Sequence, residues 1–469
     1  MKKPLLLDGC AGEGGGQLVR LACALAAVTS QPIRIINVRG NRERSPGLKP
    51  QHASAIEWLA KVTGAEVEGL HVGSRTLEFR PSVPATALRE RKIQIVAGSK
   101  GASTLLIFQA VFPYLLYAGN DNKEIELEIQ GSTNASFSPS FEYVDQVLLP
   151  TLEERFEIVV GRQLVKRAWT VGPLGDGCVR FRFKPLAPGH TLRLVKPWLQ
   201  QPLNGINLER IDISILVPHA VREPLERGLV ARLGAEFPDV DINFVLNEES
   251  GHDARLYVLL VAHAKSSHRL TKDDEGGNLR WGRDYLYDRS AKKKKPESLA
   301  REMAATVTKR LYEEIRTPNS GGGSTVTAVA AVDEYLQDQL VVFQALAQGR
   351  STYWCREADR WKSDRSPSST DISTPGGIDD EITPSREEFT SRSPDENENE
   401  NSRIMRRDKV DQPFGFGSLH TTTARWVASE LMPAVQWFNN GTICEGAGVS
   451  VPGSEAEEAG RQLSGLSLS

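Results

Sequence analysis

The chain has 469 residues, enough for two or three domains, and its 57 Lys and Arg against 60 Asp and Glu leave a net charge of −3. No apolar run approaches the roughly 20 residues of a membrane span, and Leu5–Leu7 is too short for the apolar core of a signal peptide. The five cysteines form no CxxC pair, which is typical of a reducing compartment. We therefore expect an intracellular protein with no membrane segment.

A glycine-rich turn follows the first predicted strand. Pro4–Leu7 predicts a short buried strand, Asp8–Gly16 contains five glycines and Glu13, and Leu18–Val28 predicts a buried helix. Glycine lets backbone N–H groups approach an anion, and a helix N-terminus adds its positive dipole end. The spacing matches neither a P-loop nor a dinucleotide fingerprint. Glu13 would suit such a site if a divalent metal joins it to phosphate, and a tight turn with a solvated glutamate is the alternative.

A basic loop follows the strand predicted over 33–38 and leads into a helix predicted to run to about Val62. Its notable residues are Arg39, Arg42 and Arg44, with Gln51 and His52 at the start of the helix. Arginines near a strand end can bind phosphate through two N–H groups at once. The alternative is a solvated basic loop in which His52 is an ordinary polar residue.

The strand–turn–helix pattern then occurs a second time. Ile93–Val96 predicts a strand, a Gly/Ser turn follows, and 104–116 predicts an apolar helix in which Gln109 is the only amide. A buried amide needs partners, so Gln109 bonds either to backbone or to a ligand at the helix edge. A further strand is predicted over 124–129 and a helix over 140–156.

The middle of the chain changes character at about residue 186. Strands over 158–184 precede a compact αβ insert, in which strands at 191–196, 209–217, 241–246 and 254–262 surround a helix at 219–235. Residues 264–296 are predicted to be a polar solvated loop, and the lysine run that ends it is at most a weak nuclear signal.

The last third alternates ordered and polar segments. Helices are predicted over 297–316 and 332–343. Residues 351–413 are rich in Ser, Pro and acidic residues and predict a disordered insertion, and 456–469 reads as a tail. Order is predicted to resume at Phe414, with His420 on a strand before a helix over 424–431.

Taken together, these stretches resemble the RNA 3′-terminal phosphate cyclase family. The resemblance rests on Asp8–Arg20, on Arg39 with Pro46–Leu48 and Gln51–His52, on Glu334–Leu340, and on His420–Thr421, in the family's order. It implies an α+β fold in which three repeated units, each of two helices against a four-stranded sheet, form a large domain with a smaller αβ domain inserted. The implied ranges are 1–185, 291–350 and 414–455 for the large domain and 186–290 for the inserted one.

The resemblance also implies a three-step reaction that consumes ATP. A histidine attacks the α-phosphate and forms a covalent enzyme–AMP, AMP passes to an RNA 3′-phosphate, and the neighbouring 2′-hydroxyl closes a 2′,3′-cyclic phosphodiester. His420 matches the family's nucleophile, and a neutral imidazole is a good nucleophile near pH 7. The implied partners are ATP and an RNA with a 3′-phosphate end, and the implied location is the nucleus.

The family's other site residues carry over to matching positions. Glu13 would bind the divalent metal, Mg or Mn. Arg20, Arg39, Arg42, Gln51 and His52 would line the site for phosphates and the RNA end, where positive charge stabilises phosphoryl transfer. Tyr335 and Pro139 would stack on adenine, and Gln109, Asp338 and Gln339 would supply polar contacts.

Two other classes of function are open on the sequence. One is a catalytically inactive cyclase-like factor in pre-rRNA processing and small ribosomal subunit biogenesis, and the other is a generic RNA-binding αβ protein. An inactive branch has no reason to keep His420, Arg39 and Glu13 together, and RNA binding alone does not explain the helix around Tyr335. We therefore favour the enzyme.

Overall fold

The structure is a computed structural model that describes residues 2–42, 45–120, 123–196, 203–204, 208–265, 277–287, 294–315, 328–353, 414–415, 417–438 and 441–452. The predicted insertion over 351–413 lies outside these residues except at its two ends, and the predicted tail over 456–469 lies wholly outside them. In the described ranges, every helix is too short or too polar to cross a membrane.

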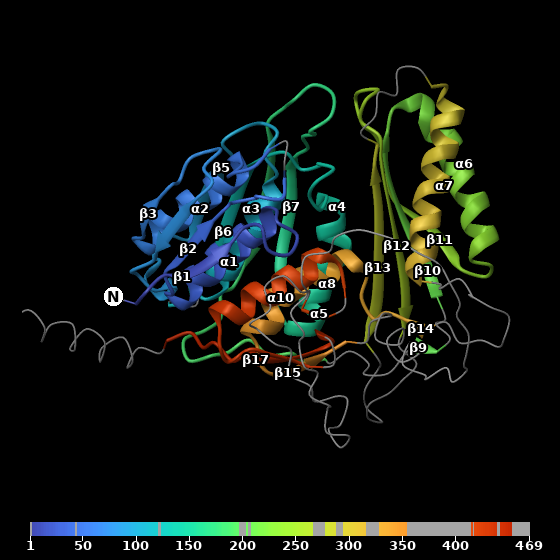
Figure 1. Ribbon diagram of the computed structural model, residues 1–469. Helices are drawn as coiled ribbons and strands as arrows, with labels where there is room; N and C mark the ends of the chain where they lie inside the picture. The colour runs from blue at the N-terminus through green and yellow to red at the C-terminus, as the bar shows by residue number, and fades with distance from the viewer. Residues whose placement is uncertain are drawn as a thin grey trace, which may run out of the picture.

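The N-terminal unit is a four-stranded sheet with two helices, as predicted (Figure 1). Its elements are β1 (Leu5–Asp8), α1 (Gly16–Thr29), β2 (Ile33–Ile36), α2 (Pro50–Thr63), β3 (Glu66–Glu68) and β4 (Leu77–Arg80). The strand order is β1–β2–β4–β3, with β1 and β2 parallel and the other pairs antiparallel. Alternate residues such as Ile33 and Ile35 are buried, because successive side chains of a strand point to opposite faces of the sheet.

The second unit repeats this order as β5–β6–β8–β7, again with the first pair parallel. Its elements are η1 (Ala85–Ala87), β5 (Lys92–Val96), α3 (Thr104–Leu116), β6 (Ile125–Gly131), α4 (Phe141–Tyr143), the π-helical turn η2 (Val144–Leu148), α5 (Leu149–Phe156), β7 (Val160–Lys166) and β8 (Gly177–Phe183). The helix predicted over 140–156 is thus α4, η2 and α5 in succession.

The third unit has three strands among the described residues, in the order β15–β17–β16. Its elements are α8 (Glu334–Leu346), β15 (Gln348–Thr352), α10 (Leu419–Leu431), β16 (Gln436–Phe438) and β17 (Ile443–Ala447). A parallel bridge joins Arg193 to Gln348, where the first unit has β1 beside β2. The strand predicted over 191–196 is therefore reduced to isolated bridges. Because Arg193 occupies the place of a first strand in the third unit, the inserted domain follows that place in the chain and precedes α8.

Order in the third unit extends past residue 350, where the insertion was predicted to begin. Ser351 and Thr352 pair with Cys444 and Ile443 across the sheet. Both are polar, so composition alone grouped them with the Ser-rich chain that follows, whereas pairing with a distant strand places them in β15.

The inserted domain is a four-stranded sheet whose outer face is covered by two long helices (Figure 1). Its elements are β10 (Leu208–Val217), α6 (His219–Glu236), β11 (Asp241–Glu249), β12 (Tyr257–Lys265), β13 (Asn278–Leu286) and α7 (Pro296–Ile315). The strand order is β11–β10–β12–β13, and a separate two-stranded ladder joins β9 (Leu203–Asn204) to β14 (Ala328–Val329). Leu225, Leu229 and Leu233 are fully buried at a spacing of four, which fixes the inner face of α6.

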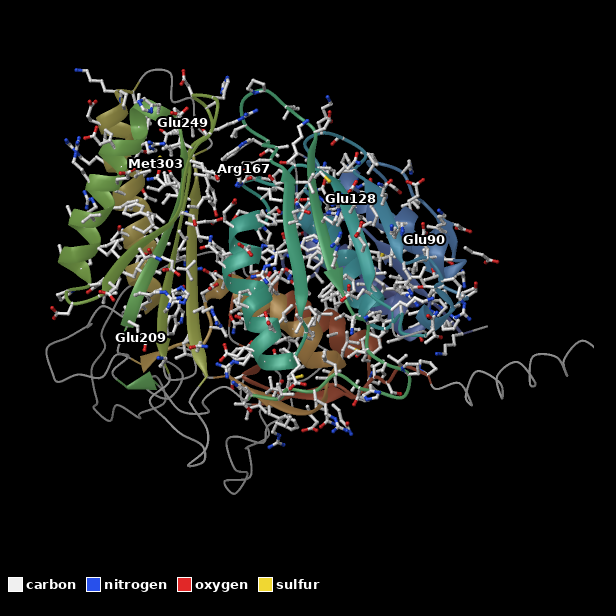
Figure 2. All side chains as sticks on the ribbon, turned by 180° about the vertical axis from the view of Figure 1, so that it is seen from behind. Glu90, Glu128, Arg167, Glu209, Glu249 and Met303 are labelled. Carbon is white, nitrogen blue, oxygen red and sulfur yellow. The ribbon has the colours of Figure 1, made fainter. Side chains whose placement is uncertain are left out.

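Two features of this domain correct the sequence analysis. β13 lies in the segment that was predicted to be a loop. That prediction was wrong because the segment has a polar pattern, with Arg283 among its buried residues, and it is antiparallel pairing with β12 that makes it a strand. The helix predicted over 297–316 is α7, which packs against α6 and β13 although the division at 290 assigned it to the large domain. Met303, labelled in Figure 2, is fully buried on α7. The next residue, Ala304, faces Gly228 of α6.

Helices of different units meet at the centre of the large domain. α1 packs against α3 and α10, and α10 packs against α8 (Figure 1). Leu18, Leu340 and Val427, one from each of α1, α8 and α10, are fully buried. This packing brings the N-terminal ends of α1 and α10 to the side of α8, where the candidate site lies.

Candidate active site

The glycine-rich turn is held against the third unit. Gly12 and Gly14 have φ of +61° and +59°, and a Cβ on Gly12 would collide with the Thr423 hydroxyl. The backbone N–H of Glu13 donates to the Thr423 Oγ1 at 2.8 Å. Glycine is required here because α10 leaves no room for a side chain, and the result is that Glu13 is positioned from two distant segments.

His420 lies in the first turn of α10, which corrects its predicted place on a strand. The helix begins at Leu419, and the Ser418 Oγ accepts from the backbone N–H of Thr421 at 3.2 Å as an N-cap. The Thr423 hydroxyl donates back to the Leu419 carbonyl at 2.6 Å, which satisfies this β-branched residue within the helix. His420 is therefore close to the positive end of the helix dipole.

Gln17 links His420 to Asp338. The Gln17 Nε2 donates to the Asp338 Oδ2 at 2.9 Å, so the amide oxygen of Gln17 faces His420 and lies 2.6 Å from its Nδ1. Because an amide oxygen only accepts, Nδ1 must carry the proton and the lone pair of the neutral ring lies on Nε2. The hydrogen-bond network thus selects the tautomer of His420.

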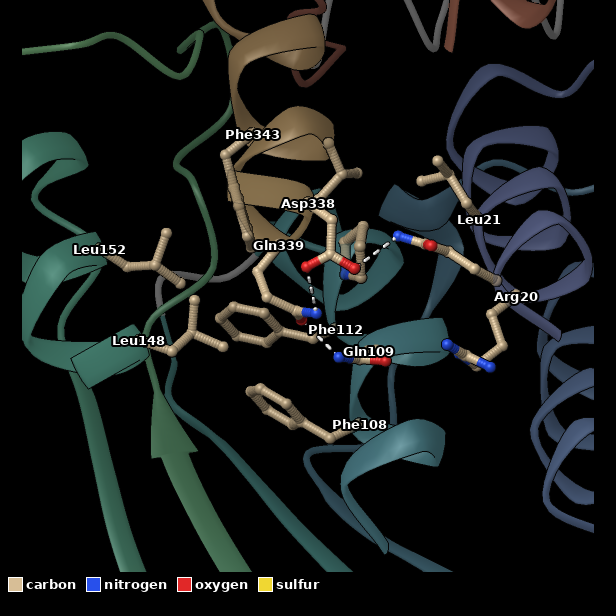
Figure 3. Close-up of a pocket in the computed structure, with 13 residues that line it drawn as sticks. Arg20, Leu21, Phe108, Gln109, Phe112, Leu148, Leu152, Asp338, Gln339 and Phe343 are labelled. Carbon is tan, nitrogen blue, oxygen red and sulfur yellow. Dashed lines mark hydrogen bonds between the residues drawn. The ribbon is translucent and has the colours of Figure 1, made fainter. Parts of the chain in front are cut away.

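A row of amides and one carboxyl forms the wall beside α8 (Figure 3). The Gln339 Nε2 donates to the Asp338 Oδ1 at 3.0 Å, and the Gln109 Nε2 donates to the Gln339 side chain. Gln109 therefore bonds to another side chain of the site. Burial raises the pKa of Asp338 to about 6, although the nearby charges of His420 and Arg20 act in the opposite direction.

Three arginines gather beside the glycine turn. Burial lowers the pKa of Arg20 to about 10, with the charge of Arg39 adding to this and Glu13 opposing it. Burial, followed by the charge of Arg42, also lowers the pKa of Arg39, and its Nε is buried without a hydrogen-bond partner. Arg42 forms an ion pair with Glu13. Three guanidinium groups beside one turn concentrate positive charge and N–H donors, an arrangement suited to binding an anion.

His52 supplies an uncharged donor to the same cluster. Its Nδ1 accepts from the backbone N–H of Lys49 at 3.3 Å, which leaves the hydrogen on Nε2, and Nε2 is buried without a partner. Burial, with the charges of Arg20 and Arg39, lowers the pKa of His52 well below 6.5. A Cβ on Gly16 would meet both the His52 ring and the Arg20 guanidinium, so both side chains lie against the start of α1.

Gln51 precedes His52 on α2, and its side chain is 7% exposed. The cleft described below does not include it among its lining residues.

Glu13 is the acidic residue of the cluster. Its Oε2 is buried without a hydrogen-bond partner and lies 4.0 Å from the Nδ1 of His420. The described part of the chain contains no group of three or more His, Cys, Asp or Glu side chains arranged to hold a metal. One carboxylate completed by substrate phosphates is a usual way to hold Mg²⁺, so Glu13 fits that role only together with a bound polyphosphate.

A cleft of about 260 Å³ opens between α1, α3, α8, α10 and β13. It is lined by Arg20, Leu106, Gln109, Ser136, Phe137, Ser138, Pro139, Tyr143, Asp284, Tyr335, Asp338, Gln339 and His420. Tyr335 is 42% exposed, its ring meets the Tyr143 ring edge-on at 6.1 Å, and the Arg283 guanidinium lies 4.5 Å from its centroid. Packing on one side therefore leaves aromatic surface of Tyr335 for a flat ligand.

The structure adds residues that the sequence analysis did not assign. Gln17 lies between the glycine-rich turn and the predicted helix, within the stretch Asp8–Arg20, and its signal was an amide beside the apolar residues that begin the helix. Asp284 and Arg283 lie on β13, which was predicted to be a loop, so no sequence signal placed them beside Tyr335.

Comparison with known proteins shows the family of this chain. Residues 11–363 match the family model described as RNA 3′-terminal phosphate cyclase, and α10 with His420 lies beyond the matched range. The RNA 3′-terminal phosphate cyclase of Hyperthermus butylicus is 31% identical over 353 residues, which is 74% of this chain and 85% of the relative. That of Methanosarcina mazei is 34% identical over 354 residues, 75% of this chain and 90% of the relative. The chain therefore belongs to the RNA 3′-terminal phosphate cyclase family.

Proposed function

We propose that this protein converts an RNA 3′-phosphate into a 2′,3′-cyclic phosphodiester. The reaction consumes ATP and passes through a covalent histidine–AMP intermediate. The observation that carries the proposal is the hydrogen bond from the His420 Nδ1 to the Gln17 amide oxygen. It leaves the lone pair on Nε2, in a residue that lines the same cleft as Arg20 and Tyr335.

In the first step the Nε2 of His420 attacks the α-phosphorus of ATP, and pyrophosphate leaves. The imidazolium that forms keeps its proton on Nδ1, which donates a hydrogen bond to the Gln17 amide oxygen, and Asp338 holds the Gln17 amide in that orientation. Arg20 stabilises the charge on the phosphoryl oxygens, and Tyr335 and Pro139 stack on the adenine base.

In the second and third steps AMP moves to the RNA 3′-phosphate, and the 2′-hydroxyl then displaces it. The donors available for the RNA end are the guanidinium of Arg39 and the Nε2–H of His52, since both have buried nitrogen atoms without partners. A neutral donor beside charged arginines binds the phosphate without adding a further charge to be neutralised. A divalent metal on Glu13, when bound, would neutralise charge on the phosphates.

The proposal is tested by incubating purified protein with α-labelled ATP and then denaturing it. Label that stays on the protein, is lost in acid and survives alkali indicates a phosphoramidate, as expected for histidine–AMP. RNA with a 3′-phosphate should remove the label and become cyclised. Protein that acquires no label would instead favour the catalytically inactive alternative.

A further inference from the structure

The inserted domain builds one end of the cleft. A second cavity adjoins the cleft, and the two share Ser136, Ser138, Asp284 and Tyr335 in their linings. His420 lines only the first cavity, whereas Arg310 of α7 lines only the second. Asp284 and Tyr335 therefore lie where the cleft meets the second cavity.

The Asp284 carboxylate is fixed by neighbouring hydroxyl groups and still has acceptor positions that these groups do not use. The hydroxyls of Ser140 and Tyr257 lie beside it and 2.6 Å from each other, so one of their two protons joins the two oxygens and the other is donated to Asp284. A carboxylate offers about four acceptor positions, so positions remain for a ligand in the cleft. Burial raises the pKa of Asp284 to about 6, which leaves the group mostly ionised at pH 7.

The strand that carries Asp284 is fastened to the aromatic platform. The neighbouring Arg283 lies over the Tyr335 ring at 4.5 Å, and the Arg310 Nη1 donates to the Asp284 carbonyl at 3.2 Å. The backbone N–H of Gly282 donates to the Asp333 Oδ2 at 2.8 Å, and Asp333 is the N-cap of α8. The carboxyl of Asp284 thus keeps a defined position beside Tyr335.

A base stacked on Tyr335 has its faces covered and only its edge free for polar recognition. An ionised carboxylate at that edge accepts from an N–H group and repels a carbonyl oxygen. We propose that Asp284 of the inserted domain accepts a hydrogen bond from the exocyclic amine of the stacked purine and thereby selects adenine. This inference rests on the proposed function and deepens it, because it assigns base selection to the domain outside the repeats.

The test compares ATP with purine riboside 5′-triphosphate, which has hydrogen in place of the 6-amino group. The rate of formation of covalent enzyme–nucleotide at subsaturating nucleotide is measured for both. Wild type should prefer ATP by at least about tenfold, since a hydrogen bond to a charged group is lost with the analogue. In Asp284→Ala this ratio should fall to about 1–3.

Asp212→Ala is the matched control, because Asp212 is a buried acid of the same sheet that lies outside the cleft. It should keep the wild-type ratio. Each ratio is internal to one protein, so a loss of active protein does not change it. A wild-type ratio near one, or an unchanged ratio in Asp284→Ala, overturns the inference while leaving the proposed function intact. Absence of label from either nucleotide on wild type would overturn the proposed function itself.

Discussion

At the residue scale, the hydrogen bond between His420 and Gln17 determines which ring nitrogen of His420 can act as a nucleophile. The 2.6 Å contact places the proton on Nδ1, so the ring can act as a nucleophile only through Nε2. A histidine whose ring is already oriented loses little freedom on reaction, which lowers the barrier to attack by its Nε2.

We predict that His420→Ala abolishes self-adenylylation and leaves thermal unfolding close to that of wild type, because its side chain is 49% exposed. The measurement is retention of α-labelled AMP on denatured protein. His219→Ala is the matched control, since His219 also lies in the first turn of a helix but is 81% exposed on α6 of the inserted domain. Covalent AMP on the His420 variant would show that another residue is the nucleophile.

Arg39→Ala and Arg42→Ala should each slow transfer of AMP to RNA by about tenfold or more, because each removes a charge-assisted phosphate contact. Arg34→Ala removes an arginine of β2 that is 58% exposed and should leave transfer unchanged. Single-turnover transfer from preformed enzyme–AMP isolates this step. Equal rates for all four proteins would reduce the loop to a solvated basic surface.

His52 gives a prediction about stability and pH. Its pKa in the folded protein is well below 6.5, so the unfolded chain binds a proton that the folded chain does not as the pH falls through 6.5. Stability is therefore complete above that pH and decreases below it. Between pH 7 and pH 5, wild type should lose roughly 2 kcal/mol of unfolding free energy more than His52→Asn, measured by urea denaturation. Parallel curves for the two proteins would mean that His52 is not held neutral.

At the scale of helices and strands, the site is formed by three helices from distant parts of the chain, whose polar residues meet one another. α1 supplies Gln17, α8 supplies Asp338 and α10 supplies His420. Each helix buries an apolar face in the common core, and the polar residues at its edge are left to pair with one another. The chain of hydrogen bonds from Asp338 through Gln17 to His420 is thus a consequence of helix packing and not of a single sequence motif.

Gln17→Leu should slow the first step by about tenfold or more, because it removes the acceptor for His420 Nδ1 and the donor to Asp338. The pH dependence of the rate should also change, since the tautomer is no longer selected. Gln31→Leu makes the same substitution just past the other end of α1, where Gln31 bonds only to backbone carbonyls, and serves as the control. A wild-type rate and pH profile for Gln17→Leu would exclude a positioning role.

At the scale of the whole molecule, one buried side chain joins the two ends of the long polar insertion. The Arg425 Nη2 donates to the Tyr353 hydroxyl at 3.1 Å, and its Nη1 donates to the Phe414 carbonyl at 2.9 Å. Tyr353 and Phe414 are both buried, so the ends of the segment between them are held by the core of the third unit.

Replacing residues 354–413 by a short Gly/Ser linker should leave enzyme–AMP formation largely intact. The ends are already held together by Arg425, and the cost of closing a loop grows only slowly with its length. Cooperative thermal unfolding establishes that the shortened protein folds, and α-labelled ATP then measures the first step. A shortened protein that folds but acquires no label would place part of the ATP site within the removed segment.

The sequence by itself determined the features that depend on local pattern. Apolar periodicity and turn residues predicted the first two strand–turn–helix units, and the structure confirms them at β1–α1–β2 and β5–α3–β6. The strand–turn–helix predictions succeeded because neighbours along the chain set their own backbone conformation. Glu13, Arg39 and His52 were assigned to one site by the family resemblance, and the structure places them close together.

Only the tertiary structure decided the features that depend on distant partners. β13 is a strand because β12 pairs with it, and Arg283 is tolerated there because it meets Glu314 and Asp333. The partner of His420 is 403 positions away in the chain, so no local pattern could indicate Gln17. Long-range pairing and burial override local preference. In this protein they determine the tautomer of His420 and place Asp284 in the lining of the cleft.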